Sequence, residues 1–395
     1  MNIYMDVTNA CRSAQNTGMQ RMTRKIFAEL SHRANVHPIC WNSIGQFYTD
    51  LGDGEFRFLT RPFDAHGSAS SRPEWRGHDP LSEFFRRLRR RRIHVDEQIG
   101  PDDVFLVPDI YRDTRRHGIP AFVKRTPGRT IAIFHDATDL ALTHVYGDRE
   151  KKSRPYVESL SDFDLVICVS QEACDDLLHF WNKFGRSAAE VRVELWPGEL
   201  EGSRTSEPVG NTIAFVSSFH ARKNHLGLLR AAEKLWSEGF SFELELVGRS
   251  TGSPFNNIVR EILKLKARGR PLHWLRHVDD ETLLEVYRDC RFTVYPSLME
   301  GYGLPIVESL LHGKPVVCGG NGALGEVARG GGCLIVDQTN DDALADGIKT
   351  LLQNRQLYAR LCEEARARRF RSWSDYIEKF LSYLQASNAT VAISN

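Results

Sequence analysis

Short runs of apolar, often β-branched residues recur along the chain and alternate with amphipathic stretches of helical period. This alternation predicts buried parallel strands that are connected by helices. In the first half we expect strands at Asn2–Val7, Val36–Cys40, Val104–Val107, Thr130–Phe134, Leu165–Ser170 and Val191–Leu195. In the second half we expect them at Thr212–Val216, Phe242–Val247, Leu272–Leu275, Phe292–Tyr295, Pro315–Cys318 and Cys333–Val336. The pattern therefore indicates an α/β protein with two doubly wound parallel sheets.

The stretch Trp196–Gly210 separates the two series of strands and is rich in Gly, Pro, Ser and Glu, which predicts a hinge. The chain has 395 residues, of which 41% are hydrophobic, so it exceeds one ordinary core and suits two lobes of roughly 180 residues each. We therefore assign residues 1–200 to an N-terminal domain and residues 208–370 to a C-terminal domain.

The segment Tyr295–Glu308 places two carboxylates on a glycine-rich loop that enters a helix. Gly301 and Gly303 loosen the backbone there, and the N–H groups and dipole of the first helical turn favour an anion such as phosphate. Glu300 in the loop and Glu308 on the helix can point into one cleft and accept hydrogen bonds from sugar hydroxyls. The alternative is that these acidic residues merely complement the helix dipole.

Arg222 and Lys223 lie between the strand Thr212–Val216 and an amphipathic helix. This position is the carboxyl edge of a parallel sheet, where open α/β folds bind ligands. A guanidinium beside an ammonium can neutralise a diphosphate there without metal. Taken alone, the pair is equally typical of a solvated basic turn.

The Arg-Lys-Asn turn at 222–224 and the Glu-x7-Glu motif that ends at Glu308 together resemble the retaining GT-B glycosyltransferases of family 4. The glycine-rich run Gly313–Val327 is similar to that family too. The resemblance implies two Rossmann-like domains that face each other across a cleft. The first would bind the acceptor and the second the nucleotide-sugar donor, and a C-terminal helix at about 371–385 would cross back to the first domain.

The resemblance also implies roles for individual residues. Glu308 would bind the donor ribose, and Glu300 would contact the transferred sugar near the reacting carbon. Arg222 and Lys223 would bind the diphosphate, assisted by the loop and helix start at Gly301, Gly303 and Leu304. The base would lie against the strand end that carries His277 and Val278, with Gly248 nearby, and backbone groups would bind it.

Two positions in the first half extend the resemblance. The segment Thr17–Arg21 is similar to the Thr-Gly-Ile-Gln-Arg loop of the family, and Gly18 would let the backbone approach the donor phosphate or the acceptor. His135 and Asp136 follow a buried strand, where the family places a His-Asp pair facing the donor sugar. We expect both to act in catalysis, whereas His135 alone would suit a structural role.

Charge and cysteine usage narrow the partners and the compartment. A net charge of +1 gives no overall field for nucleic acid. Eight scattered cysteines without a Cys-x-x-Cys pair predict reduced thiols in a cytoplasmic protein. The N-terminus enters a strand directly, so we expect no signal peptide, and no apolar run has the length of a membrane span.

Residues 84–94 carry six arginines beside large apolar side chains. A basic amphipathic helix of this kind can lie on an anionic membrane, which suggests peripheral contact at the inner face of the plasma membrane. A solvated helix face and a nucleic-acid contact are the alternatives.

We expect no metal and no cofactor apart from the nucleotide-sugar substrate. Asp162-Phe-Asp164 mimics the metal-binding Asp-x-Asp of another transferase class, but it precedes a strand and lies away from the ligand edge. Asp279-Asp280-Glu281 fits a helix start.

The resemblance thus implies transfer of a hexose, with retained anomeric configuration, to a hydroxyl of a glycan or a lipid-linked acceptor. Loops similar to those of mannosyltransferases favour GDP-mannose and a role in bacterial surface polysaccharide or lipopolysaccharide synthesis. A UDP- or TDP-sugar donor stays open, as does a non-catalytic nucleotide-sugar-binding protein.

Overall fold

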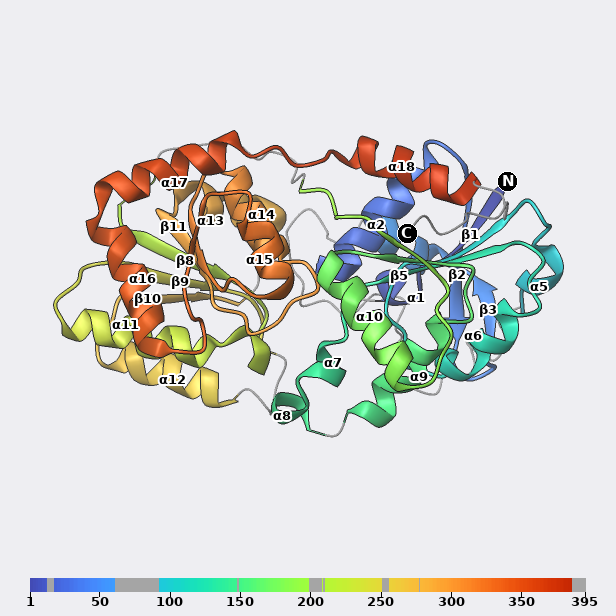
Figure 1. Cartoon of the computed structure of the whole chain (residues 1–395), viewed down its shortest axis with the longest axis horizontal. Helices are drawn as coiled ribbons and strands as arrows, with labels where there is room; N and C mark the ends of the chain where they lie inside the picture. The colour runs from blue at the N-terminus through green and yellow to red at the C-terminus, as the bar shows by residue number, and fades with distance from the viewer. Residues whose placement is uncertain are drawn as a thin grey trace.

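The computed structural model describes residues 1–12, 18–60, 92–147, 149–198, 208, 210–250, 256–276 and 278–385. Within them, two α/β domains lie side by side, each with a central sheet covered by helices on both faces (Figure 1). The two-domain α/β architecture expected from the hydrophobic pattern is therefore confirmed.

The N-terminal domain contains a seven-stranded sheet with the order β3-β2-β1-β4-β5-β6-β7. Its strands are β1 (Asn2–Asp6), β2 (Asn35–Asn42), β3 (Phe47–Asp50), β4 (Val104–Val107), β5 (Arg129–Phe134), β6 (Leu165–Cys168) and β7 (Glu190–Val193). Its helices are α1 (Thr8–Cys11), α2 (Gly18–Ser31), α3 (Asp53–Thr60), α5 (Val95–Gln98), α6 (Arg115–Val123), α7 (Thr138–Ala141), α8 (Thr143–Tyr146), α9 (Glu150–Leu160) and α10 (Gln171–Lys183).

The C-terminal domain contains a six-stranded parallel sheet with the order β10-β9-β8-β11-β12-β13. Its strands are β8 (Thr212–Val216), β9 (Glu243–Val247), β10 (Leu272–Leu275), β11 (Phe292–Tyr295), β12 (Val316–Cys318) and β13 (Cys333–Ile335). Its helices are the 3₁₀ turn η1 (Ala221–Lys223), α11 (His225–Ser237), α12 (Asn256–Ala267), α13 (Asp280–Asp289), α14 (Leu304–Leu311), α15 (Gly322–Ala328), α16 (Asp341–Gln353) and α17 (Arg355–Ala367).

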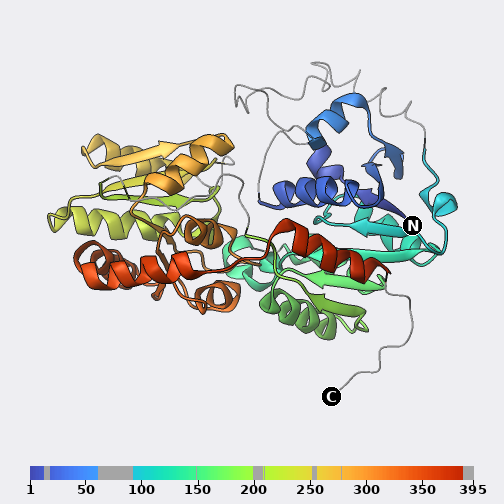
Figure 2. The same cartoon turned by 90° about the horizontal axis from the view of Figure 1, so that it is seen from above.

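The last helix, α18 (Trp373–Gln385), leaves the C-terminal domain and lies on the N-terminal one beside α2 (Figures 1 and 2). The side chains of Trp373, Tyr376 and Phe380 are buried there, because the apolar face of the helix packs against that domain. Tyr383 adds a 2.7 Å hydrogen bond from its hydroxyl to Glu194 Oε2. The chain thus passes between the domains twice.

The first sheet contains one strand that was not predicted, β3, which runs antiparallel to β2, whereas its other strand pairs are parallel. The Asn42 side chain accepts hydrogen bonds from the N–H groups of Ile44 and Gly45, and Gln46 takes a positive φ of 55°. This turn reverses the chain and pairs Phe47–Asp50 with β2. Four residues next to a turn carry too little alternation to be read as a strand.

The predicted strand Leu165–Ser170 also ends early, at Cys168. Ser170 instead caps α10, since its hydroxyl accepts a 3.0 Å hydrogen bond from the Ala173 N–H group. A serine before an amphipathic stretch is a common helix start, so this boundary could have been read from the sequence.

Candidate functional site

The loop between β11 and α14 has the backbone that the glycine pattern predicts. Gly303 directly precedes α14 with φ 109°, a conformation that favours glycine, and a proline follows in the first turn. Glu300 lies in this loop with 8% of its surface exposed. Its carboxylate is therefore turned into the protein, where it needs partners.

Glu300 lies within a compact charged cluster. Arg222 and Lys223 from η1 each form an ion pair with one of its two carboxylate oxygens. Ser297 Oγ lies 2.5 Å and Tyr295 Oη 3.0 Å from Glu300 Oε1, and Lys223 Nζ donates to Tyr295 Oη over 2.6 Å. The structure thus brings together the basic turn and the first acidic residue, which are far apart in the sequence.

The protonation states follow from this packing. Burial raises the pKa of Glu300, but the positive charges of Arg222 and Lys223 outweigh it and lower the pKa to about 2. Burial and the charge of Arg222 lower the pKa of Lys223 to about 8, against the attraction of Glu300. At neutral pH the cluster therefore holds one carboxylate and two cations, a net positive site.

Asn224, the third residue of the Arg-Lys-Asn turn, has a structural role. It takes a left-handed φ of 53° and caps α11 through a 3.2 Å hydrogen bond from the Gly227 N–H group. Its amide also donates to the carbonyl of Gln338 over 2.7 Å. Asn tolerates this backbone better than most residues, so it fixes the direction in which the two preceding cations point.

Glu308 is held from both domains. Arg21, near the start of α2, forms an ion pair with Oε1, and Tyr287 on α13 donates its hydroxyl to Oε2 over 2.7 Å. Sequence reasoning assigned Glu308 but missed both partners. The Arg in the Thr-Gly-Met-Gln-Arg segment was the available signal, since it is a cation near a helix start that faces the other sheet.

The two domains touch at the glycines of the motif. An added Cβ on Gly301 would collide with the carbonyl oxygen of His135 and lie 3.0 Å from Asp136 Cβ. Ser170 Oγ donates to the Gly301 carbonyl over 2.6 Å. A Cβ on Gly18 would lie 3.2 Å from Leu304 Cδ1, so the start of α2 adjoins the start of α14. The structure therefore brings these sequence-predicted positions together across the domain boundary.

His135 has one nitrogen bonded and one without a partner. Nε2 lies 2.7 Å from the Pro108 carbonyl oxygen and must donate to it, whereas the buried Nδ1 has no hydrogen-bond partner. Burial lowers the pKa of His135, so the ring is neutral and Nδ1 is a proton acceptor. Asp136 Oδ1 accepts from Thr138 Oγ1 over 2.6 Å, which fixes the turn into α7.

The expected base-binding residues meet at the ends of β9 and β10. Gly248 has φ 144° and donates its N–H group to the Leu275 carbonyl over 2.9 Å, and its own carbonyl accepts from Trp274 Nε1 over 2.8 Å. Val278 packs beside this edge in a small apolar cluster. His277 lies outside the described residues.

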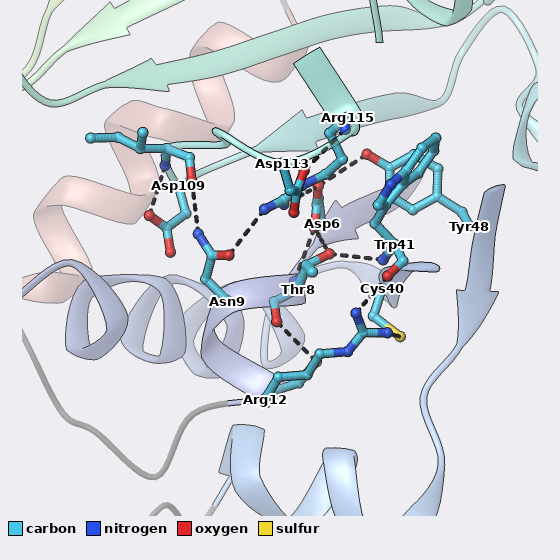
Figure 3. Close-up of polar contacts among 12 residues, drawn as sticks. Asp6, Thr8, Asn9, Arg12, Cys40, Trp41, Tyr48, Asp109, Asp113 and Arg115 are labelled. Atoms are coloured by element: carbon cyan, nitrogen blue, oxygen red, sulfur yellow. Dashed lines mark hydrogen bonds and ion pairs between the residues drawn. The ribbon is translucent and has the colours of Figure 1, made fainter. Parts of the chain in front are cut away.

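A buried polar network at the carboxyl end of β1 was missed by the sequence reasoning (Figure 3). Arg115 Nη1 pairs with Asp6 Oδ2 over 2.9 Å, and Nη2 donates to Asn9 Oδ1 over 3.0 Å. Tyr48 and Thr8 donate to the same Asp6 carboxylate. Burial raises the pKa of Asp6, but the charge of Arg115 and the hydrogen bonds from Thr8 and Arg115 lower it below its usual value. The network fixes the carboxyl edge on which His135 lies.

Among the described residues, one group of side chains has the composition of a metal site: Cys11, Cys40 and Glu55, all buried. Arg12 lies within the same group, with Nε 3.2 Å from Glu55 Oε1 and Nη2 3.4 Å from Cys40 Sγ. The guanidinium thus already balances the carboxylate and occupies the position where a cation would be attracted.

The acidic pairs have the structural roles that their positions predict. Asp164 Oδ2 accepts 2.8 Å hydrogen bonds from Thr130, and Asp279 caps α13 by accepting from the Thr282 N–H group over 2.8 Å. Most of the basic segment 84–94 lies outside the described residues. In the part of the chain that the structure describes, no helix has the length and apolarity needed to cross a bilayer.

A known family matches the part of the chain that carries these motifs. Residues 202–368 match the model of the family "Glycosyl transferases group 1". The chain is similar to the O-antigen chain mannosyltransferase B of Escherichia coli, with 27% identity over 62% of this chain and 66% of that protein. It also resembles the serotype-specific mannosyltransferase WbdA of Escherichia coli, with 31% identity over 39% of this chain and 21% of that protein.

Solved structures with the same architecture share little sequence. HepE of Anabaena in complex with UDP-glucose superposes with a TM-score of 0.67 and 18% identity, covering 97% of this chain and 100% of that one. Sucrose-phosphate synthase from Thermosynechococcus elongatus has a TM-score of 0.68 and 16% identity, with 98% of both chains covered. Together with the sheet topology, these matches confirm the expected GT-B fold. The C-terminal part of the chain, residues 202–368, is therefore similar to the glycosyl transferases group 1 family, and the two α/β domains together have a GT-B fold.

Proposed function

We propose that this protein is a retaining glycosyltransferase that moves a hexose from a nucleoside diphosphate sugar to a hydroxyl of a glycan or lipid-linked acceptor. The observation that carries the proposal is the charged cluster in which Glu300 pairs with Arg222 and Lys223. It lies beside the start of α14, which carries Glu308 and adjoins the N-terminal domain. Cations and a helix start suit a diphosphate, and carboxylates suit sugar hydroxyls.

In the proposed reaction, the bond between the anomeric carbon and the diphosphate oxygen breaks. A new bond forms from the acceptor oxygen to the same face of that carbon, so the configuration is kept. The acceptor proton passes to the departing diphosphate oxygen. Arg222 and Lys223 would stabilise the charge that develops on the leaving group, and Glu300, which is paired with both, would stabilise the positive charge that develops on the sugar.

We propose a role for His135 in binding the transferred sugar, based on the hydrogen bonding of its two ring nitrogens. With Nε2 donating to Pro108, the partnerless Nδ1 is available to accept a hydrogen bond from a sugar hydroxyl. Asp136 would contribute mainly by shaping this turn, because its carboxylate accepts from Thr138. His135 is therefore the better candidate for direct contact with the transferred sugar.

We favour GDP-mannose as the donor, with the base at Gly248, His277 and Val278. Two mannosyltransferases among the similar proteins support mannose. HepE, whose structure contains UDP-glucose, keeps a UDP-sugar as the second candidate. Backbone readout at the strand edge would leave the choice of base to small differences in shape.

We further propose that the reaction needs neither metal nor additional cofactor, because Arg222 and Lys223 supply two positive charges for the diphosphate. An O-antigen chain mannosyltransferase among the relatives supports a surface polysaccharide acceptor. We place the reaction in the cytoplasm as part of this proposal. Contact with the inner face of the membrane through residues 84–94 belongs to the same proposal.

The proposal is tested by incubating the enzyme with GDP-mannose, UDP-glucose or TDP-rhamnose and a lipid-linked acceptor, with EDTA present. We expect one donor to give product, with the anomeric configuration of the donor retained in the NMR spectrum of the new linkage. Glu300→Gln should lower turnover at least 100-fold, because the substitution removes the charge opposite the leaving group. Turnover unchanged in that variant would instead support a non-catalytic nucleotide-sugar-binding protein.

A further inference from the structure

Arg21 is a charged residue whose contact crosses the domain boundary. It belongs to α2 of the N-terminal domain, whereas its ion-pair partner Glu308 belongs to α14 of the C-terminal domain. The Arg21 side chain is 19% exposed and that of Glu308 only 6%. An ion pair at this depth interacts more strongly than a surface pair.

The partners of Glu308 occupy both carboxylate oxygens. Arg21 binds Oε1, and Tyr287 donates to Oε2. If the carboxylate accepts two ribose hydroxyls, as the proposed function requires, at least the Oε1 position must be shared or vacated. A ribose hydroxyl that binds Oε1 would therefore approach the atom with which Arg21, a residue of the opposite domain, is paired.

A displaced Arg21 needs a new counter-ion. Burial opposes its charge, and the negative charge of Glu308 restores it and holds the pKa of Arg21 above its ordinary value. Releasing a largely buried guanidinium without a new anion is costly. The diphosphate of the donor is such an anion.

Arg21 lies near the helix start at which we propose that the diphosphate binds. Gly18, three residues earlier, adjoins Leu304 at the first turn of α14. The N-terminal ends of two helices therefore meet at one point, and both favour negative charge. Arg222 and Lys223 border the same loop from the other side through Glu300.

We propose that Arg21 is a donor-binding residue supplied by the N-terminal domain, which pairs with Glu308 in this structure and moves to the diphosphate when the donor ribose binds Glu308. This inference rests on the proposed function. It also links donor occupancy to domain closure, since the same side chain would bridge the domains in both states. A nucleoside without phosphates would break the first contact and gain no second one.

If this exchange occurs, replacing Arg21 should change the affinity for a nucleoside and the affinity for its diphosphate in opposite directions. Calorimetric titration of the full chain, directly and by displacement, would compare GDP with guanosine and UDP with uridine. In Arg21→Met, we expect the nucleoside to bind about tenfold more tightly and its diphosphate about tenfold more weakly than in wild type. Arg21→Lys, which keeps a charge without the fork, should give smaller changes of the same signs.

Arg33→Met is the matched control, because Arg33 lies just after the opposite end of α2 and pairs with Glu29 and Ser374, neither of which is placed in the donor site. It should change neither affinity, and thermal unfolding would verify that all variants are folded. Changes in Arg21→Met that are below twofold, or equal in sign for nucleoside and diphosphate, would overturn the exchange. If wild type binds no nucleoside diphosphate at all, the proposed function itself fails, and the two failures are distinguishable.

Discussion

Gly301→Ala is predicted to impair closure of the two domains with little effect on either domain alone. Gly301 does not adopt the left-handed backbone, so alanine is tolerated locally. The added methyl would collide with the His135 carbonyl oxygen and lie 3.0 Å from Asp136 Cβ. The carbonyl is backbone and cannot rotate away, so the domains must separate.

The cost follows from the nature of the clash. Overpacking against rigid atoms costs about 1–3 kcal/mol, which corresponds to a population of the closed state lower by about 5- to 150-fold. If transfer occurs only in the closed state, kcat/KM falls by that factor. Donor binding through Glu308 and Arg222, which belong to the C-terminal domain, should change less than the rate.

A graded glycine series provides the assay. Initial rates would be measured for Gly301→Ala, for Gly18→Ala, whose Cβ meets only the flexible end of Leu304 at 3.2 Å, and for Gly100→Ala, whose Cβ would lie 3.5 Å from Asp103 Oδ2. We expect a large loss of rate for Gly301→Ala, a small loss for Gly18→Ala and no loss for Gly100→Ala. Equal rates for Gly301→Ala and Gly100→Ala would refute the claim that this contact governs closure.

Three further changes test the site and its support. Lys223 has a pKa of about 8, lowered by burial and by Arg222, so its charge is present below pH 8 and lost above it. Diphosphate affinity should therefore fall from pH 7 to 9 in wild type and stay nearly flat in Lys223→Arg, as measured by calorimetry. Arg115→Met leaves the buried Asp6 carboxylate without its counter-ion, which should lower the free energy of unfolding by about 3–5 kcal/mol in urea titrations. Asn224→Ala removes the α11 cap and strains a left-handed turn, so the free energy of unfolding should fall by about 1–2 kcal/mol in the same titrations. Because this turn carries Arg222 and Lys223, the free energy of diphosphate binding, measured by calorimetry, should change by more.

Much of the fold could be predicted because local pattern and global structure agree. The strand β8 was predicted with the bounds that the structure has, Thr212–Val216, since a buried strand next to an amphipathic helix has only one sensible interpretation. The hairpin to β3 could not be predicted, because its signal is a side-chain turn at Asn42 together with a positive φ at Gln46. Neither is visible as hydrophobic periodicity.

Some residues of the candidate site could likewise be predicted from the sequence, and others could not. The motif residues Glu300, Arg222 and Lys223 could be named from spacing and resemblance, because they follow strands at the ligand edge of one sheet. Tyr287 could not be named, since its role depends on how α13 packs against α14. For Arg21 the sequence offered only a cation near a helix start, because its pairing with Glu308 depends on how the two domains meet.

We propose that Glu308, Arg222 and Lys223 together bind a nucleoside diphosphate. The most direct test is calorimetric titration of GDP, UDP, TDP and ADP, with EDTA present, into wild type and Glu308→Ala. We expect one of these ligands to bind wild type tightly without metal, and we expect Glu308→Ala to lower the affinity for that ligand at least tenfold. Binding of none, or equal binding by both proteins, would contradict it.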